Sequence, residues 1–186
     1  MFKKALMAAT IAMATSITHA EGMYFGLSAG QSSIDISEFD DETSFTLSLG
    51  KKFSDYFAVE VAYSDLGEFE ASFSDENFEE EAQIDVRLIN LSAVGILPLS
   101  DSFELFAKAG VTHWRTSLDS RSIDGNFMSS IEIDNSGSDL SLGAGATAHL
   151  SDNFSLSFEY MLTEMNPAET DDYDVSNVSL GARWNF

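Results

Sequence analysis

The stretch "LSDNFSLSFEYMLT" (residues 150–163) joins a polar turn to ten residues that alternate between two kinds of side chain. Every second position is large and apolar: Phe154, Leu156, Phe158, Tyr160 and Leu162. The positions between them are mostly small or polar: Ser155, Ser157, Glu159, Met161 and Thr163. Because successive side chains of a strand point to opposite faces, this pattern predicts a β-strand with one apolar face.

The Ser-Asp turn before this strand occurs three times, as "FSDYF" (residues 53–57), "LSDSF" (99–103) and "LSDNF" (150–154). Its aspartates, Asp55, Asp101 and Asp152, are 46 and 51 residues apart. Such a period indicates a repeated supersecondary unit. Each unit consists of a strand, a long polar excursion, a second strand and then the short turn.

Eight strands can be recognised, at residues 24–30, 45–53, 57–64, 84–99, 103–115, 140–150, 154–163 and 178–186. The long excursions are residues 31–42, 65–81, 117–138 and 164–174. The alternation slips around residues 89–91, where we expect a β-bulge, and the register there stays open. Short turns at one end and long loops at the other are typical of an outer-membrane barrel. We therefore predict an all-β, eight-stranded antiparallel transmembrane β-barrel, an up-and-down meander with Asp55, Asp101 and Asp152 in periplasmic turns.

Composition limits the function further. Residues 1–20 combine Lys3 and Lys4, a short apolar run and a small-residue end, which predicts a cleaved signal peptide. Without its two lysines, the remaining 21–186 barrel domain has 7 Lys and Arg against 31 Asp and Glu. This acidity argues against nucleic-acid binding. The chain has no Cys, and no run of residues is long and apolar enough for a membrane helix.

A soluble, lipocalin-like barrel shares the period-two strands and is the alternative fold. The aromatic residues favour the membrane barrel. Phe57 and Phe154 stand beside turns, and Tyr63 and Tyr160 each follow six residues later. Six residues cover roughly 20 Å of strand, which is close to the spacing of the two aromatic girdles of a membrane barrel.

The chain ends with "SLGARWNF" (residues 179–186), in which Gly181, Trp184 and Phe186 form a Gly-x-x-aromatic-x-aromatic pattern. This resembles the C-terminal signal read by the bacterial barrel-assembly machinery. With "FELFAKAGVTHW" (residues 103–114), the chain resembles the small outer-membrane β-barrel family that includes the transmembrane domain of outer-membrane protein A. The resemblance implies a charged, closed lumen and roles in envelope structure, adhesion or host interaction; some members are proposed to conduct weakly. Because the sequence ends at Phe186, we expect no wall-binding domain.

Charged residues on the face expected to point inward form a candidate lumen cluster. They are Glu60, Glu104, Lys108, Glu159 and Arg183. Asp85 and Arg87 join them if the register holds. In a narrow lumen such charges must pair, because an unpaired buried charge is costly. They therefore predict either a salt-bridged plug or a gate that opens when pairing partners exchange.

An enzyme that modifies lipid A is a further alternative. His149 and Ser151 have the His-x-Ser spacing of lipid A deacylases of this barrel class, but Ser151 lies in a turn expected at the wrong end. His113 lies nearer the outer rim, beside Trp114, without an oriented serine and acid. Acidic excursions such as "EFEASFSDENFEEE" (residues 68–81) suit hard cations, yet no calcium-loop spacing is present. We predict neither a metal site nor a cofactor.

The sequence therefore predicts a protein of the bacterial outer membrane that is not an enzyme. Its expected role is structural or surface-interacting, exercised through four acidic extracellular loops. A narrow channel for small solutes is the second hypothesis. The expected partners are outer-membrane lipid and lipopolysaccharide, the barrel-assembly machinery and an extracellular ligand at the loops.

Overall fold

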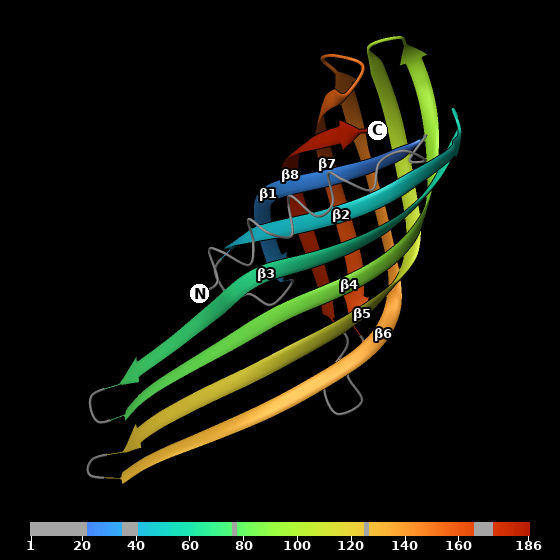
Figure 1. The fold of residues 1–186 in the computed structure, drawn as a ribbon. Helices are drawn as coiled ribbons and strands as arrows, with labels where there is room; N and C mark the ends of the chain where they lie inside the picture. The colour runs from blue at the N-terminus through green and yellow to red at the C-terminus, as the bar shows by residue number, and fades with distance from the viewer. Residues whose placement is uncertain (1–21, 35–40, 76–77, 125–126, 166–172) are drawn as a thin grey trace, which may run out of the picture.

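The computed structural model describes residues 22–34, 41–75, 78–124, 127–165 and 173–186. They form eight strands: β1 (Met23–Ile34), β2 (Glu42–Ser54), β3 (Phe57–Asp75), β4 (Phe78–Ser100), β5 (Phe103–Asp124), β6 (Phe127–His149), β7 (Phe154–Met165) and β8 (Tyr173–Asn185). Each strand pairs antiparallel with the next, and β8 pairs with β1 to close the barrel (Figure 1). The predicted meander is confirmed. The expected signal peptide lies outside the described residues.

The barrel turns its apolar side chains outward. Exposed examples from six strands are Leu47, Val61, Leu91, Val111, Leu142 and Phe158. The inward positions hold small or polar residues and ionised groups, among them Ser44, Asn90, Thr112, Ser157 and Lys108. A soluble barrel has the opposite polarity, so the lipocalin-like alternative is wrong. No helix in the described part of the chain is long and apolar enough to cross a membrane.

The three Ser-Asp turns lie at one end of the barrel, which we call the short-turn end. Asp55 and Asp101 occupy tight turns between β2 and β3 and between β4 and β5, and Asp152 lies between β6 and β7. Ser hydroxyls stabilise all three turns. The Ser54 Oγ accepts the Tyr56 N–H, the Ser100 Oγ accepts the Ser102 N–H, and the Ser151 Oγ accepts the Phe154 N–H. Short polar side chains that accept backbone N–H groups favour such turns.

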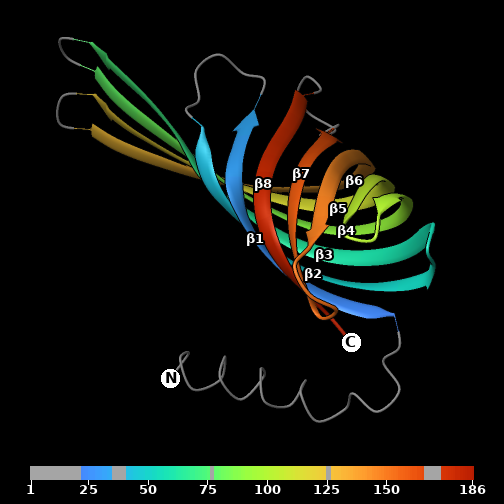
Figure 2. The same cartoon turned by 90° about the horizontal axis from the view of Figure 1, so that it is seen from above.

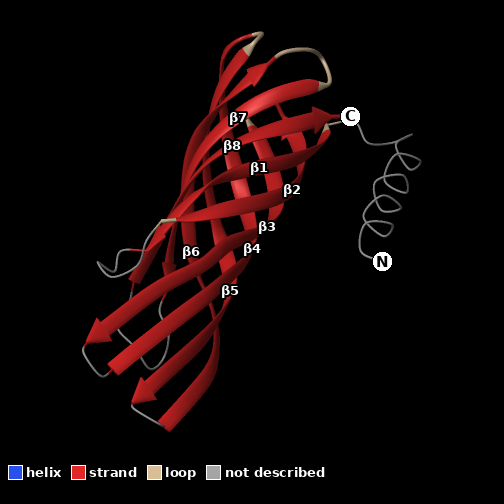
Figure 3. Ribbon diagram, turned by 90° about the vertical axis from the view of Figure 1, so that its left-hand side faces the viewer, coloured by secondary structure: helices blue, strands red, loops and turns tan. Residues whose placement is uncertain are grey.

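Four strands are much longer than the others at the opposite, extended end. β3, β4, β5 and β6 have 19, 23, 22 and 23 residues, whereas β1 and β7 have 12. Together they form one four-stranded sheet that leaves the barrel on one side (Figures 2 and 3). The expected excursions at residues 65–81 and 117–138 are thus mostly hairpin strands, which corrects the prediction. Residues 35–40 and 166–172 of the other two lie outside the described residues.

The predicted bulge at residues 89–91 is wrong. β4 pairs with β5 without interruption from Phe78 to Pro98, and the shift falls between Pro98 and Ser100. The alternation looked broken because β4 turns apolar Val86 and Leu88 inward near one end and polar Asn90 inward at the middle. The same register places Asp85 and Arg87 on the outer face. The expectation that they join the lumen cluster is therefore wrong.

An apolar cluster, the outer plug, fills the lumen toward the extended end. It comprises Ile34, Leu66, Phe69, Val86, Leu88, Trp114, Met165 and Val175. The side chains of Phe69, Val86, Trp114 and Met165 are fully buried. Six of the eight strands contribute, so the plug joins the long sheet to the short strands β1, β7 and β8. Such a packed apolar core excludes water.

Candidate functional site

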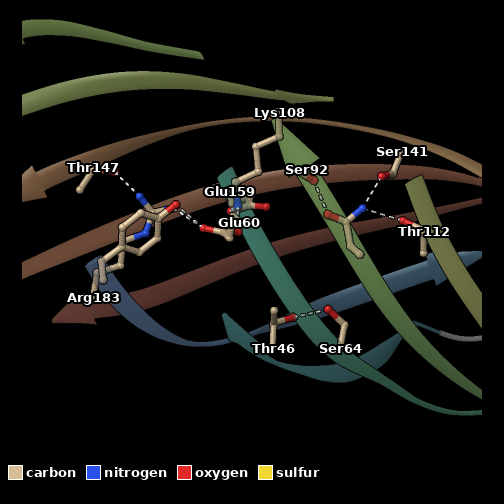
Figure 4. A network of polar contacts seen from close by, with 12 residues as sticks. Thr46, Glu60, Ser64, Ser92, Lys108, Thr112, Ser141, Thr147, Glu159 and Arg183 are labelled. Carbon is tan, nitrogen blue, oxygen red and sulfur yellow. Dashed lines mark hydrogen bonds and ion pairs between the residues drawn. The ribbon is translucent and has the colours of Figure 1, made fainter. Parts of the chain in front are cut away.

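The centre of the lumen holds an ion-pair network, the central cluster, formed by Glu60, Lys108, Glu159 and Arg183 (Figure 4). The Lys108 Nζ lies 2.6 Å from the Glu60 Oε1 and 2.6 Å from the Glu159 Oε2. The Arg183 Nη2 approaches the Glu60 Oε2 at 3.9 Å. These side chains come from β3, β5, β7 and β8, and the network therefore ties opposite walls of the barrel together.

Aromatic rings and hydroxyls complete the environment of these charges. The Tyr24 O–H donates to the Glu60 Oε2 at 2.8 Å. The Arg183 guanidinium lies over the rings of Tyr24 and Phe106, at 5.1 and 4.9 Å from their centroids, and it donates to the Thr147 Oγ1 at 3.3 Å. Cation–π contacts of this kind are strongest where water is excluded. Among the described residues, no buried side-chain nitrogen or oxygen lacks a hydrogen-bond partner.

Gly50 makes room for the Tyr24 ring. A Cβ atom at Gly50 would overlap the Cζ and Oη atoms of Tyr24. We therefore expect Gly50→Ala to lower the free energy of unfolding by about 1–3 kcal/mol, because overpacking displaces a ring that supports Glu60. The measurement is a urea titration of the protein folded in lipid vesicles.

Gly95→Ala is the matched control, since a Cβ there meets only the Ala107 carbonyl oxygen at 3.9 Å. Equal stabilities of the two variants would show that Tyr24 can move without cost.

Glu104 lies apart from the central cluster, although the sequence grouped it there. It belongs to an inner cluster nearer the short-turn end, where the Lys52 Nζ lies 3.0 Å from its Oε2 and the His149 Nε2 lies 3.3 Å away. The other imidazole nitrogen, Nδ1, is 2.8 Å from the Ser155 Oγ. Sequence reasoning missed Lys52, yet the alternation of β2 places it on the inward face, two positions after Gly50.

His149 therefore bonds to Ser155, and not to Ser151 as the His-x-Ser spacing suggested. Ser155, His149 and Glu104 form a serine–imidazole–carboxylate chain, but Ser155 is fully buried. Its Oγ also accepts the Asn185 Nδ2–H at 3.1 Å, and Lys52 already neutralises Glu104. A nucleophile needs access to substrate. The contacts fit a cross-barrel strut between β2, β5, β6, β7 and β8.

A polar layer separates the central cluster from the outer plug. The Asn90 Nδ2 donates to the Thr112 Oγ1 at 2.7 Å and to the Ser141 Oγ at 2.5 Å (Figure 4). The Asn90 Oδ1 also accepts a hydrogen bond from Ser92. A cavity of about 50 Å³ adjoins this layer, lined by polar groups and by Leu66 and Leu88 of the plug. That volume holds only about three or four water molecules.

The terminal strand places the three residues of the expected assembly signal on β8 and directly after it. Trp184 lies on the outer surface with its ring edge-on to Phe154, and Phe186 is also exposed. The Phe186 N–H donates to the Met23 carbonyl at 2.9 Å, next to the β1–β8 seam. Gly181 fits against Ser28, where a Cβ would lie 2.8 Å from the Ser28 Cβ.

The described lumen is thus obstructed at three heights, by the inner cluster, the central cluster and the outer plug.

Sequence comparison identifies the family to which this barrel belongs. The sequence model of the outer membrane protein beta-barrel domain matches residues 4–186. The chain belongs to this outer-membrane β-barrel family. It is accordingly a protein of the bacterial outer membrane. A search of curated proteins found no match to the chain.

Solved structures show the same fold at low sequence identity. Neisserial surface protein A superposes with a TM-score of 0.64 at 16% identity, covering 89% of this chain and 98% of that one. Ail of Yersinia pestis, in complex with the heparin analogue sucrose octasulfate, gives 0.59 at 17%, covering 89% and 99%. OprG of Pseudomonas aeruginosa gives 0.56 at 13%, covering 90% and 97%. At these identities the likeness establishes the fold alone.

Proposed function

We propose that this outer-membrane barrel is a structural and surface-interacting protein that acts through its extended sheet. The extended end faces the outside of the cell, and the turns with Asp55, Asp101 and Asp152 face the periplasm. The difference between the two ends supports this orientation, since short turns are periplasmic in barrels of this kind.

The length of β3 to β6 is the observation that carries the proposal. A tilted strand needs about 9–11 residues to cross the bilayer. β4 and β6 have 23 residues each. About half of each strand is therefore available beyond the membrane, as one continuous sheet. A barrel serving only to fill the membrane has no need of this sheet.

The sheet also has two free edges. On one side, β3 pairs with β2 only as far as Asp65, so among the described strands residues 68–75 have β4 as their one neighbour. On the other side, β6 pairs with β5 from Phe127 to Ala148, but with β7 only from Ser141 onward. Among the described strands, residues 127–140 therefore have one neighbour. The unpaired N–H and C=O groups of an edge strand can bind an extended segment of a partner by adding a strand.

The negative charge of the sheet limits the kind of partner that it can bind. Residues 68–81, in the β3–β4 hairpin, include seven acidic residues and no Lys or Arg. Ail binds a polysulfated sugar in its crystal structure. A polyanion of that kind is a poor match for this acidic hairpin, because like charges repel. We propose a cationic protein or peptide segment as the partner.

Shortening the two hairpins is expected to weaken partner binding while the barrel still folds, because it removes part of each free edge and five of the seven acidic residues at 68–81. The register gives the cutting points, because Ala71 pairs with Ala82 and Ser120 with Ile131. Residues 72–81 and 121–130 are each replaced by Asn-Gly, a two-residue hairpin turn. The plug residues Phe69, Val86 and Trp114 are retained. Binding is measured with an extended Lys-Val repeat peptide on protein folded in lipid nanodiscs.

A Glu-Val repeat peptide is the control ligand, and the gel shift on boiling checks folding. Equal binding of the Lys-Val peptide by the intact and shortened barrels would refute a role of the sheet. Equal binding of both peptides by the intact protein would remove the argument from charge.

Two further parts of the proposal concern what the barrel does not do and what assembles it. A closed lumen with a cavity of about 50 Å³ supports a plugged barrel over a channel. The burial of Ser155 supports a protein that is not an enzyme. Gly181, Trp184 and Phe186 would present the terminal strand to the barrel-assembly machinery. The channel is the second candidate because Glu60 approaches both Lys108 and Arg183, so a change of its pairing partner would be a route to opening. Its test is single-channel conductance.

A further inference from the structure

A group of basic side chains lies on the outer wall of the barrel, just beyond the lipid-facing belt. Arg87 on β4 is directly opposite Arg115 on β5. His113 is two residues before Arg115 and therefore on the same face. All three side chains are exposed. We call Arg87, His113 and Arg115 the basic patch.

The basic patch stands out against the rest of the surface. The chain has only 9 Lys and Arg against 31 Asp and Glu. Of the described Lys and Arg side chains, Lys52, Lys108 and Arg183 point into the lumen, and Lys51 lies outside near the short-turn end. Arg87 and Arg115 are the remaining two, and they are neighbours. Like charges directly opposite each other on adjacent strands are destabilising unless something neutralises them.

Acidic neighbours neutralise only Arg87. The Asp85 Oδ2 lies 2.8 Å from the Arg87 Nη2, and the Asp65 Oδ2 lies 3.9 Å from its Nε. Arg115 has Arg87 opposite on one side and Ser136 on the other. No described side chain forms a salt bridge with Arg115. Asp134, two residues before Ser136 on β6, accepts a hydrogen bond from the Ser117 Oγ at 2.7 Å.

Hydroxyl and imidazole groups surround Arg115 on its remaining sides. His113 Nδ1 lies 3.0 Å from the Ser138 Oγ, and Ser136 and Ser117 border Arg115 across and along the sheet. A guanidinium has five donors in a planar fork that suits a phosphate. One guanidinium without an acid, a second beside it and several hydroxyls form a donor set for a phosphate group.

The height of the basic patch indicates what carries that phosphate. Leu91 and Val111 are lipid-facing neighbours, and the rows of His113 and Arg115 follow two and four residues later. At about 3.3 Å per residue and a tilt of ~45°, these rows lie roughly 5 and 9 Å above Val111. The polar headgroup region adds roughly 5–7 Å on each side of the hydrocarbon. A long Arg side chain can reach down into that region.

We propose that the basic patch binds the phosphate group of an outer-leaflet lipid, with Arg115 as its main contact. This inference rests on the proposed orientation, which puts the extended end outside the cell. A phosphorylated lipid there neutralises Arg115 and lets an acidic protein sit in an anionic leaflet. The proposal does not depend on the peptide partner, because the basic patch lies on the outer face of β4 and β5, whereas the free edges at residues 68–75 and 127–140 belong to β3 and β6.

The test is native mass spectrometry of the full protein in detergent, with lipid A added as the probe and bound lipids counted. We expect Arg115→Gln to weaken the binding of lipid A at least about tenfold, the worth of one charged hydrogen bond. Arg115→Lys, which keeps the charge and loses the fork, is expected to restore part of the loss. Lys51→Gln removes an outward charge at the other end and is expected to bind as the wild type does.

Two further probes identify the source of the phosphate. Lipid A without its phosphates is expected to bind as weakly to the wild type as lipid A binds to Arg115→Gln. Equal binding of both forms, or equal binding by the wild type and Arg115→Gln, overturns the proposal. Displacement of lipid A by millimolar inorganic phosphate overturns the assignment to a lipid. The wild type could bind lipid A, lose that binding in Arg115→Gln, and yet bind no peptide at the sheet. That result would support the phosphate site and refute the surface-interaction role.

Discussion

Replacing Lys108 by alanine is expected to lower the free energy of unfolding by about 3–5 kcal/mol, as for other broken buried ion pairs. Lys108 is the only described cation within 3 Å of either Glu60 or Glu159, at 2.6 Å from each. Its removal leaves two carboxylates in a lumen with little water. Arg183 at 3.9 Å and the Tyr24 hydroxyl at 2.8 Å still support Glu60, whereas no other described ion pair supports Glu159.

The measurement is a urea titration of the protein folded in lipid vesicles, with Lys51→Ala as the control. Lys51 carries the same charge on the outer surface, where its loss is worth little. Because Glu159 is the carboxylate left without a cation, Glu159→Gln added to Lys108→Ala is expected to recover part of the loss. A Lys108→Ala variant as stable as Lys51→Ala would refute the hypothesis that the central cluster is a stabilising, salt-bridged plug.

Conductance of the same variants separates a plug from a gate. The outer plug and the inner cluster still obstruct the lumen of Lys108→Ala, so we expect silence in a planar bilayer for wild type and variant. Discrete openings that change with Lys108→Ala would instead favour the narrow channel. The stability loss and the conductance are independent readouts, so each hypothesis can fail separately.

The barrel could be predicted from the sequence because the two faces of a membrane strand carry different kinds of side chain. In β7, Phe158 and Tyr160 face outward and Ser157 faces inward, as period two requires. The length of the long strands was missed because residues 65–81 read as an acidic loop. Phe69, Ala71 and Phe73 nonetheless alternate with polar residues there, which was an available signal. Strand pairing in water tolerates charges that a lipid-facing strand cannot.

Which charges meet could be predicted only in part. Lys108 and Glu159 lie at equal distances from their turns, and the structure brings their charged atoms to 2.6 Å. Glu104 lies one position after Phe103 and pairs instead with Lys52, from the far side of the ring. The stagger between strands decides these partners, and stagger is a property of the closed barrel that no single strand encodes.

Truncating Trp114 is expected to be the other severe change. Trp114 is fully buried in the outer plug, and its Nε1–H donates to the Asp139 Oδ2 at 2.6 Å. Trp114→Ala leaves a cavity at the point where the long sheet meets the short strands, so we expect a loss of about 3–5 kcal/mol. Trp114→Phe keeps much of the volume and loses the donor, and is expected to cost about 1.5–3 kcal/mol.

The chain supplies its own control, because its second tryptophan lies on the outer surface. Trp184 is 49% exposed and touches Phe154 edge-on, with 6.4 Å between ring centroids. Trp184→Ala is expected to cost about 1 kcal/mol, the worth of one aromatic pair. Urea unfolding followed by circular dichroism compares the variants without relying on tryptophan emission. Equal losses for the two alanine variants would mean that buried Trp114 stabilises the barrel no more than an exposed aromatic pair does. A larger loss of unfolding free energy for Trp114→Ala would support the view that the outer plug is a core that both closes the lumen and anchors the projecting sheet.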